Sequence, residues 1–147
     1  MNLAYTNNNN AVTIAAAGAI PLLVQVLGPG SPVQVQKNAV TVLMVLTLNA
    51  SNVVAIATAG AIPPLVQLLG PGSPAGVQSR AAGALWTLAL NTETAVTIAA
   101  AGAIPPLVQL LGPGSSEHVQ AMAASALTAL GDSSAEIRAA IAASIDS

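Results

Sequence analysis

A segment of 42 residues recurs in phase along this chain, and this repeat constrains the fold more than any other feature. Its markers are a glycine before Ala-Ile-Pro and a later GPGS sequence; the glycines are Gly18, Gly60 and Gly102, and the GPGS copies begin at Gly28, Gly70 and Gly112. The segments that start at Ala11 and Ala95 are nearly identical as far as GPGS. A period in the forties with helix-breaking residues at fixed places predicts a stacked array of helices, in which each unit buries its apolar face against its neighbours.

Glycine and proline divide each repeat into three predicted helices. The first helix is expected to begin near residues 11, 53 and 95 and to end at the repeated glycine, with the side chains of Asn10, Asn52 and Thr94 as N-caps. The second has proline in its first turn, at residues 21, 63 and 105, and is expected to end at the first glycine of GPGS in the left-handed conformation. The third and longest is expected over about residues 35–48, 77–90 and 119–130.

Each third helix carries an apolar stripe at positions i, i+4, i+7, i+8 and i+11, which share one helix face. We predict that this stripe is buried in all three copies, which are Val35, Ala39, Val42, Leu43 and Leu46; Val77, Ala81, Ala84, Leu85 and Leu88; and Val119, Ala123, Ala126, Leu127 and Leu130. No segment shows the alternating pattern of a strand, so the predicted fold class is all-α.

These motifs resemble the armadillo repeat family. The pattern AGAIPPLVQLL…GS…VQ…AAGAL recurs in three copies over nearly the whole chain, and NAVTVLMVLTLN from Asn38 is similar to third helices of plant-type U-box and vacuolar armadillo proteins. HEAT repeats have two helices per unit and lack the AGAIPPL turn. No U-box segment is present, so ligase activity is not implied. The resemblance implies a right-handed α-solenoid of about three and a half repeats, with three helices in each repeat.

The repeat markers predict a single domain over residues 1–147. Within it we expect a remnant of a preceding repeat over 1–10, repeats over 11–52, 53–94 and 95–131, and a terminal capping or partial-repeat helix over 132–147. The terminal helix is expected to start at Ser133 or Ser134 and to carry Glu136 in its first turn. The sequence before Asn10 resembles the end of a third helix, as expected of a piece of a longer array.

The composition excludes several classes of protein. Only 5% of the residues are charged, and the three cations, Lys37, Arg80 and Arg138, are too few for the basic face that a nucleic-acid-binding protein needs. With 54% hydrophobic residues the chain is not of the disordered class, and without cysteine it forms no disulfide. Gly18, Pro21 and Gln25 interrupt the first apolar run, so we expect no membrane span.

No arrangement of residues in the sequence suits catalysis or the binding of a metal or cofactor. His118 is the sole histidine and has no evident nucleophile or orienting group beside it, so we interpret it as a solvated residue at a helix start. The five carboxylates are dispersed, and the GPGS loops lack the lysine of a phosphate-binding loop. We therefore expect no enzyme activity and no cofactor.

What remains is the groove that third helices line in armadillo arrays. Peptide-binding members place an Asn on each third helix to bond the ligand backbone, and a Trp one turn earlier. In this sequence the Asn positions hold Val45, Thr87 and Ala129, and the Trp positions hold Thr41, Gly83 and Ser125. The resemblance therefore does not imply nuclear-import-type binding of basic peptides. Helical spacing places three further residues on this face, namely Asn38, Arg80 and Met122. Trp86 either packs on the adjacent repeat or lies at the edge of the groove.

The sequence favours a non-enzymatic interaction scaffold that binds a protein or peptide in this groove. The resemblance alone implies an intracellular location, in the cytoplasm or nucleus. One alternative is a self-assembling module, because the first repeat lacks a polar cap. Its apolar residues Val12, Ile14, Leu23 and Val26 would then join two copies in a homodimer. A second alternative is a consensus-designed repeat protein, because the repeats are nearly identical.

Overall fold

The structure is a computed structural model, and it describes residues 18–146. Every regular element within that range is a helix, which confirms the predicted all-α solenoid. Residues 18–25 are helical, and the further helices are α2 (Val33–Leu46), α3 (Ala50–Thr58), α4 (Ile62–Gln67), α5 (Ala75–Ala89), α6 (Thr92–Ala100), α7 (Ile104–Gln109), α8 (Glu117–Ser133) and α9 (Ala135–Asp146).

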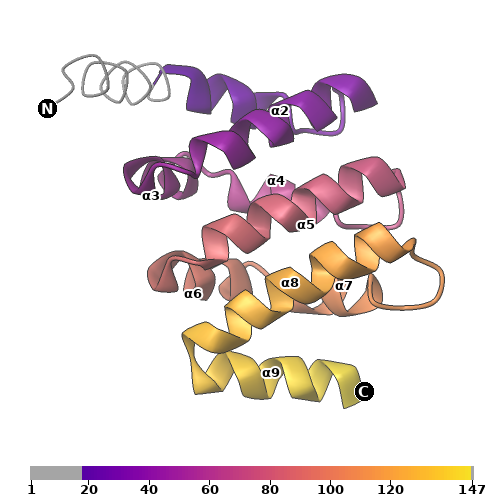
Figure 1. The fold of residues 1–147 in the computed structure, drawn as a ribbon. Helices are drawn as coiled ribbons and strands as arrows, with labels where there is room; N and C mark the ends of the chain where they lie inside the picture. Colours follow the sequence, from indigo (N-terminus) through magenta and orange to yellow (C-terminus); the bar gives the residue numbers. More distant parts are fainter. Residues whose placement is uncertain (1–17, 147) are drawn as a thin grey trace, which may run out of the picture.

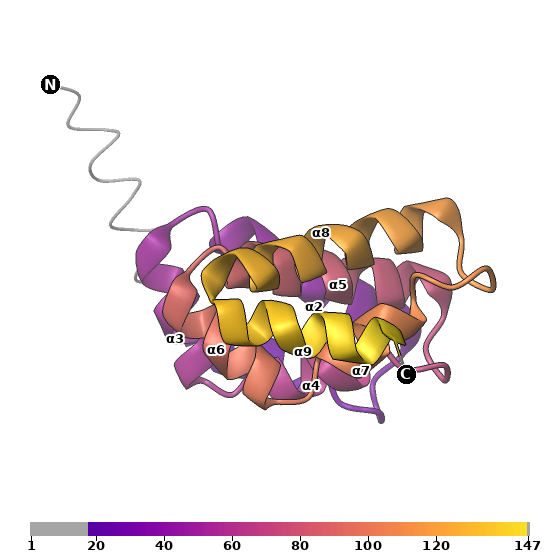
Figure 2. The same ribbon diagram turned by 90° about the horizontal axis from the view of Figure 1, so that it is seen from below.

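The helices stack in two layers. Helices α2, α5 and α8 are the third helices of their repeats and lie side by side in one layer, with α5 packed against both others (Figure 1). The shorter helices α3, α4, α6 and α7 form the other layer, and α9 packs on α7 and α8 at the C-terminal end (Figure 2). Each repeat therefore covers the apolar side of the next, as expected for a solenoid.

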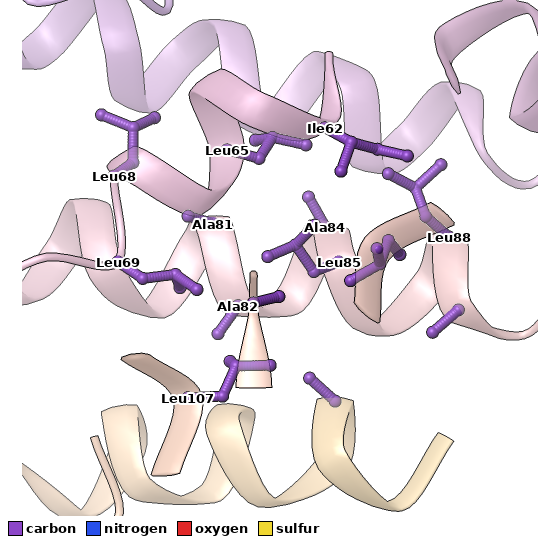
Figure 3. Close-up of a cluster of buried hydrophobic side chains, with 14 of the residues drawn as sticks. Ile62, Leu65, Leu68, Leu69, Ala81, Ala82, Ala84, Leu85, Leu88 and Leu107 are labelled. Atoms are coloured by element: carbon purple, nitrogen blue, oxygen red, sulfur yellow. The ribbon is translucent and has the colours of Figure 1, made fainter. Parts of the chain in front are cut away.

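A single hydrophobic core runs between the layers. Leu65 of α4 and Leu85 and Leu88 of α5 are almost completely buried, and Leu107 of α7 continues the cluster into the next repeat (Figure 3). The predicted stripe is fully buried in α5 and α8, which confirms the prediction for two of the three copies.

The stripe prediction is wrong for part of α2. Val35 is 39% exposed and Val42 is 43% exposed, whereas the equivalent Val77 and Ala84 of α5 are 0% and 1% exposed. Leu46 is half-buried. The difference arises because α5 has a third helix on its N-terminal side, namely α2, whereas the structure describes no third helix before α2. The same side of the repeat is thus core in one copy and surface in another.

The repeated glycine ends the first helix as predicted in two repeats. Gly60 and Gly102 have φ of 86° and 87°, a left-handed conformation that glycine adopts without strain. The N–H of Ala61 then donates to the carbonyl of Ile56 at 3.3 Å, the long hydrogen bond of a Schellman motif. The prediction is wrong for Gly18, which is the first described residue of the helical segment 18–25 and does not have positive φ. The first repeat has Leu22 at the position where the second repeat has Pro64. Unlike proline, Leu22 has a backbone N–H that can donate a hydrogen bond within a helix.

The second helix ends at the GPGS loop as predicted, but the first glycine of the loop does not adopt the predicted left-handed conformation. Gly28, Gly70 and Gly112 do not have positive φ, because the proline that follows restricts the preceding residue to extended conformations. In each loop the serine N–H donates to the carbonyl of the first glycine, as from Ser73 to Gly70 at 3.1 Å. A Cβ at Gly70 would lie 3.3 Å from the carbonyl oxygen of Gln67, so the tight turn also favours glycine.

The N-caps of the first helices lie three residues before the predicted positions. The Asn49 side chain accepts from the N–H of Ser51 at 3.1 Å, and the Asn91 side chain accepts from that of Thr94 at 3.0 Å. Asn52 is buried inside α3 and donates to the carbonyl of Leu46 at 3.0 Å, so it satisfies the end of α2 instead. The expected cap Asn10 lies outside the described residues.

A glutamine that the sequence analysis did not single out ties each GPGS loop to its third helix. The Nε2 of Gln36 donates to the carbonyls of Leu27 and Gly28 at 3.3 and 2.8 Å. Gln78 and Gln120 make the same pair of hydrogen bonds in the second and third repeats. These side chains satisfy carbonyls at the end of the second helix, which has no further turn to supply donors.

We expect Gln78→Ala to lower the free energy of unfolding by about 1–2 kcal/mol, the value of two such hydrogen bonds. Gln67→Ala is the matched control, because Gln67 is exposed on α4. Urea unfolding followed by circular dichroism measures both changes. Equal effects of the two substitutions would contradict the role of Gln78.

Candidate functional site

We call the side of α2, α5 and α8 that carries the predicted groove residues the third-helix face; Figure 1 shows these three helices side by side. The predicted residues on this face are exposed in the first repeat and half-buried or buried in the second and third. Asn38, Thr41 and Val45 of α2 are exposed. Of the remaining predicted residues, Arg80, Trp86, Thr87, Met122 and Ser125 are half-buried, and Gly83 and Ala129 are buried.

Two methionines cover Gly83. A Cβ built on this glycine would lie 3.0 Å from Met44 Cε and 3.3 Å from Met122 Sδ. Met44 of α2 and Met122 of α8 therefore both lie against the backbone of α5 at Gly83, and both are half-buried. Methionine is unbranched and polarisable, so this part of the face can adapt to different apolar side chains. The contact was not predicted, because it depends on the spacing between repeats.

Trp86 both packs against the core and edges a hollow on the face. The hollow lies between α5 and α8 and has a volume of about 340 Å³. The predicted residues Ser125 and Ala129 line it together with Trp86, and the rest of its lining is Leu90, Ala124, Thr128 and Asp132. Leu90 is 69% exposed, so the rim presents an aliphatic side chain beside the indole. Trp86 therefore contacts both the core and this hollow.

The threonine hydroxyls on this face already bond to their own helices. Thr41 Oγ1 donates to the carbonyl of Lys37 at 2.9 Å, and Thr87 Oγ1 donates to that of Ala84 at 2.9 Å. Thr87 stands at one of the three positions that the resemblance in sequence predicts to correspond to the Asn of peptide-binding members. A ligand backbone therefore finds no side-chain amide at Val45, Thr87 or Ala129.

His118 is exposed at the start of α8, as predicted. No three His, Asp or Glu side chains in residues 18–146 lie close enough together to hold a metal ion. Within the same residues, no helix has both the length and the apolar character needed to cross a bilayer.

The residues predicted for self-association lie partly outside the described range. Val12 and Ile14 are not described, and Leu23 and Val26 are half-buried and pack against the core. Leu22, which was not predicted, is the exposed aliphatic residue of this segment. Together with Val35 and Val42 it places apolar surface at the N-terminal end of the stack.

These features define a class of protein: a helical repeat protein built from three-helix units. The family model of the Armadillo/beta-catenin-like repeat matches residues 7–43, 49–90 and 91–130. The chain therefore belongs to the armadillo repeat family, as the resemblance in sequence predicted.

Several solved structures have the same fold. An engineered protein from the Northeast Structural Genomics Consortium is 32% identical, with a TM-score of 0.79 over 85% of this chain and 50% of its own. A designed armadillo repeat protein in complex with the peptide (KR)4 is 31% identical, with a TM-score of 0.79 over 86% of this chain and 53% of its own. The chain thus spans about half the length of these proteins. None of the curated proteins compared with the chain matches it.

Proposed function

We propose that this chain is a non-enzymatic scaffold that binds a polypeptide on its third-helix face and recognises mainly the side chains of that ligand. The observation that carries the proposal is the hollow beside Trp86, where an indole, an exposed leucine and small residues of α8 surround about 340 Å³. Tryptophan in a partly desolvated hollow is a common anchor of protein interfaces. The peptide complex of a designed armadillo protein supports the use of this fold for peptide binding.

The lining predicts what kind of ligand is held. The residues around the hollow include one charged side chain, Asp132, and Met44 and Met122 extend the apolar surface toward α2. An extended ligand would leave part of its backbone unpaired, because the Asn positions carry Val45, Thr87 and Ala129. Each buried polar group without a partner costs about 1–3 kcal/mol, so the grip on a peptide backbone is weak.

We expect the triple substitution Val45→Asn, Thr87→Asn and Ala129→Asn to strengthen peptide binding by at least about tenfold, since it restores three side-chain amides. Ala129 borders the hollow, which gives the new side chain room. Fluorescence anisotropy with peptides selected from a random library measures the change. Substitution of the exposed Thr58, Thr97 and Val54 by Asn on α3 and α6 is the control. No gain for any peptide would contradict the placement of the groove.

Self-association is a second candidate function, and the N-terminal end of the stack favours it. Val35 and Val42 occupy repeat positions that are core in α5 and α8, and each exposed aliphatic side chain forgoes burial worth up to about 1.5–3 kcal/mol. Lys37 is the first residue of the chain with a basic or acidic side chain, so little charge opposes association. A two-fold dimer that joins two N-terminal ends would cover these residues and close the assembly.

We expect the chain to form a dimer at micromolar to millimolar concentration, and Val35→Glu with Val42→Glu to dissociate it. Light scattering across this range measures the mass. The matched control is Val54→Glu with Val96→Glu, because these valines of α3 and α6 are 54% and 52% exposed but belong to the second and third repeats, away from the N-terminal end of the stack. A monomer at the highest concentration would leave the scaffold as the sole proposal.

The chain's resemblance to engineered armadillo proteins also supports the alternative that its near-identical repeats come from consensus design. The proposed division into repeats over 11–52, 53–94 and 95–131 with a terminal segment over 132–147 is compatible with either origin.

A further inference from the structure

Lys37 of α2 and Arg80 of α5, two of the three basic residues of the chain, lie together on the third-helix face. A Cβ built on Gly76 of α5 would lie 3.4 Å from both Cε and Nζ of Lys37, so this side chain reaches across to the backbone of the neighbouring helix (Figure 1). Arg80 follows Gly76 by four residues on the same side of α5, which separates their Cβ positions by about 6 Å. Because long side chains of a helix lean toward its N-terminus, Arg80 leans toward the ammonium group of Lys37.

No carboxylate neutralises this basic pair. Within residues 18–146 neither Lys37 nor Arg80 forms an ion pair, and both side chains are half-buried. Glu117 begins α8 at the same end of the face, but it precedes His118, which has the repeat position of Gly76, and so points about 100° away around its helix. Partly buried charges are screened by salt less than exposed ones are, so the pair is a local excess of positive charge.

The basic pair adjoins the apolar centre of the face. Gly76 and Gly83 are seven residues apart on α5, and Lys37 and Met44 have the same separation on α2. Each of these long side chains lies against one of the two glycines, Lys37 at Gly76 and Met44 at Gly83. Glycine destabilises the interior of a helix relative to alanine, and here it leaves room for the two side chains that cross from α2.

The third-helix face is therefore polarised from end to end. Lys37 and Arg80 lie in the N-terminal halves of their helices, and the methionines lie at Gly83 in the middle. The hollow beside Trp86 lies toward the C-terminal end of α5, and Asp132 is the charged residue of its lining. A ligand that matches the face needs a negative group at one end and an apolar side chain at the other.

We propose that Lys37 and Arg80 bind an acidic side chain of the polypeptide ligand, so that the face selects peptides with Asp or Glu near a large apolar residue. The inference rests on the proposed function, because it names the class of ligand for the same face. A carboxylate accepts charge-assisted hydrogen bonds from an ammonium and from the planar fork of a guanidinium. Complementary charge of this kind mainly contributes specificity, whereas the hollow beside Trp86 supplies apolar contact.

The geometry also predicts the spacing of the two groups in the ligand. Trp86 follows Gly76 by ten residues, which is about 15 Å along α5, and the hollow lies about 9 Å to the side, one spacing between packed helices. The direct distance is therefore about 18 Å, which an extended chain spans in about five residues. We expect the acidic residue to lie about five residues from Leu, Phe or Trp.

The probe is a library of random decapeptides selected for binding to the full chain. The selected peptides should contain clearly more Asp and Glu than the unselected library, at the spacing given above. The strongest acidic binder is then synthesised with a fluorescent label, together with a version that carries the neutral amide in place of its carboxylate. Anisotropy should show binding at least about threefold weaker for the neutral version.

Three single substitutions, each of which removes one positive charge, locate the effect on the chain. Lys37→Gln and Arg80→Gln should each weaken binding of the acidic peptide by about threefold or more and leave binding of the neutral version unchanged. Arg138→Gln is the matched control, because Arg138 lies on α9 and donates to the carbonyl of Gly131. Added salt should reduce the difference between the parent chain and Arg80→Gln. Circular dichroism checks that all three variants keep the helix content of the parent.

Three results would overturn this inference and leave the scaffold function standing. The first is a set of selected peptides with no excess of Asp and Glu over the unselected library. The second is binding of the acidic peptide to Lys37→Gln and Arg80→Gln as tight as to the parent. The third is an equal loss in Arg80→Gln and Arg138→Gln, which would show that only the net charge of the chain matters. A library from which no peptide is selected would overturn the scaffold function and this inference together.

Discussion

Replacement of Ala82 by glutamate is expected to lower the free energy of unfolding by more than about 3 kcal/mol, because a carboxylate without a partner would be buried between repeats. Ala82 is 0% exposed and lies on the side of α5 that faces Leu107 (Figure 3). Urea unfolding followed by circular dichroism at neutral pH measures the change.

The repeat supplies its own control for this substitution. Ala124→Glu makes the same chemical change at the same repeat position, but Ala124 is exposed near the C-terminal end of the stack. It should change the stability by less than about 0.5 kcal/mol, as is usual for surface sites. Similar losses in the two variants would contradict the stacking of α8 on the Ala82 side of α5.

A second large effect is expected from Leu85→Ala. Leu85 is 0% exposed in the middle of the core, and removal of such a side chain typically costs about 2–5 kcal/mol through lost burial and the cavity left behind. Thermal unfolding should show a clearly lower midpoint for this variant. Leu90→Ala is the control, because Leu90 lies on the same helix layer at the rim of the hollow and is mostly exposed. A wild-type midpoint for Leu85→Ala would contradict its place in the core.

The local elements could be predicted from the sequence because glycine and proline act within a few residues. Gly60 and Gly102 end their helices because each adopts the left-handed conformation. Proline is tolerated in the first turn of the short second helix, where no backbone N–H is needed. The caps were misplaced for a local reason too. Asn49 and Asn91 recur in phase just as Asn52 and Thr94 do, and sequence alone did not show which pair begins the helix.

Burial could not be predicted position by position, because it depends on neighbours that are not in the repeat itself. Val35 and Val77 have the same place in the repeat, yet one is surface and the other is core. Ala82 and Ala124 differ in the same way at the other end of the stack. A prediction for each end therefore needs the number and order of the repeats as well as their pattern.

Three of the predicted site residues lie together, whereas the contacts around them could not be predicted. Trp86, Ser125 and Ala129 were each expected on the face, and they do line one hollow. Met44, Gly83 and Met122 belong to three different repeats. The approach of both methionines to Gly83 therefore could not be predicted from the pattern of a single repeat. The repeated glutamine was visible as the recurring VQ sequence, and its fixed distance from GPGS was the signal that could have revealed its bonds to the loop.

The scaffold function is tested most directly by the position at which a selected peptide binds. Backbone amide chemical shifts of the isotope-labelled chain, recorded with and without a peptide from a random library, locate the contact. The account predicts the largest shifts around Trp86, Leu90 and Ser125 on the third-helix face, and small shifts on the outer sides of α3 and α6. Largest shifts at Val54 and Val96, or no peptide that binds at all, would contradict it.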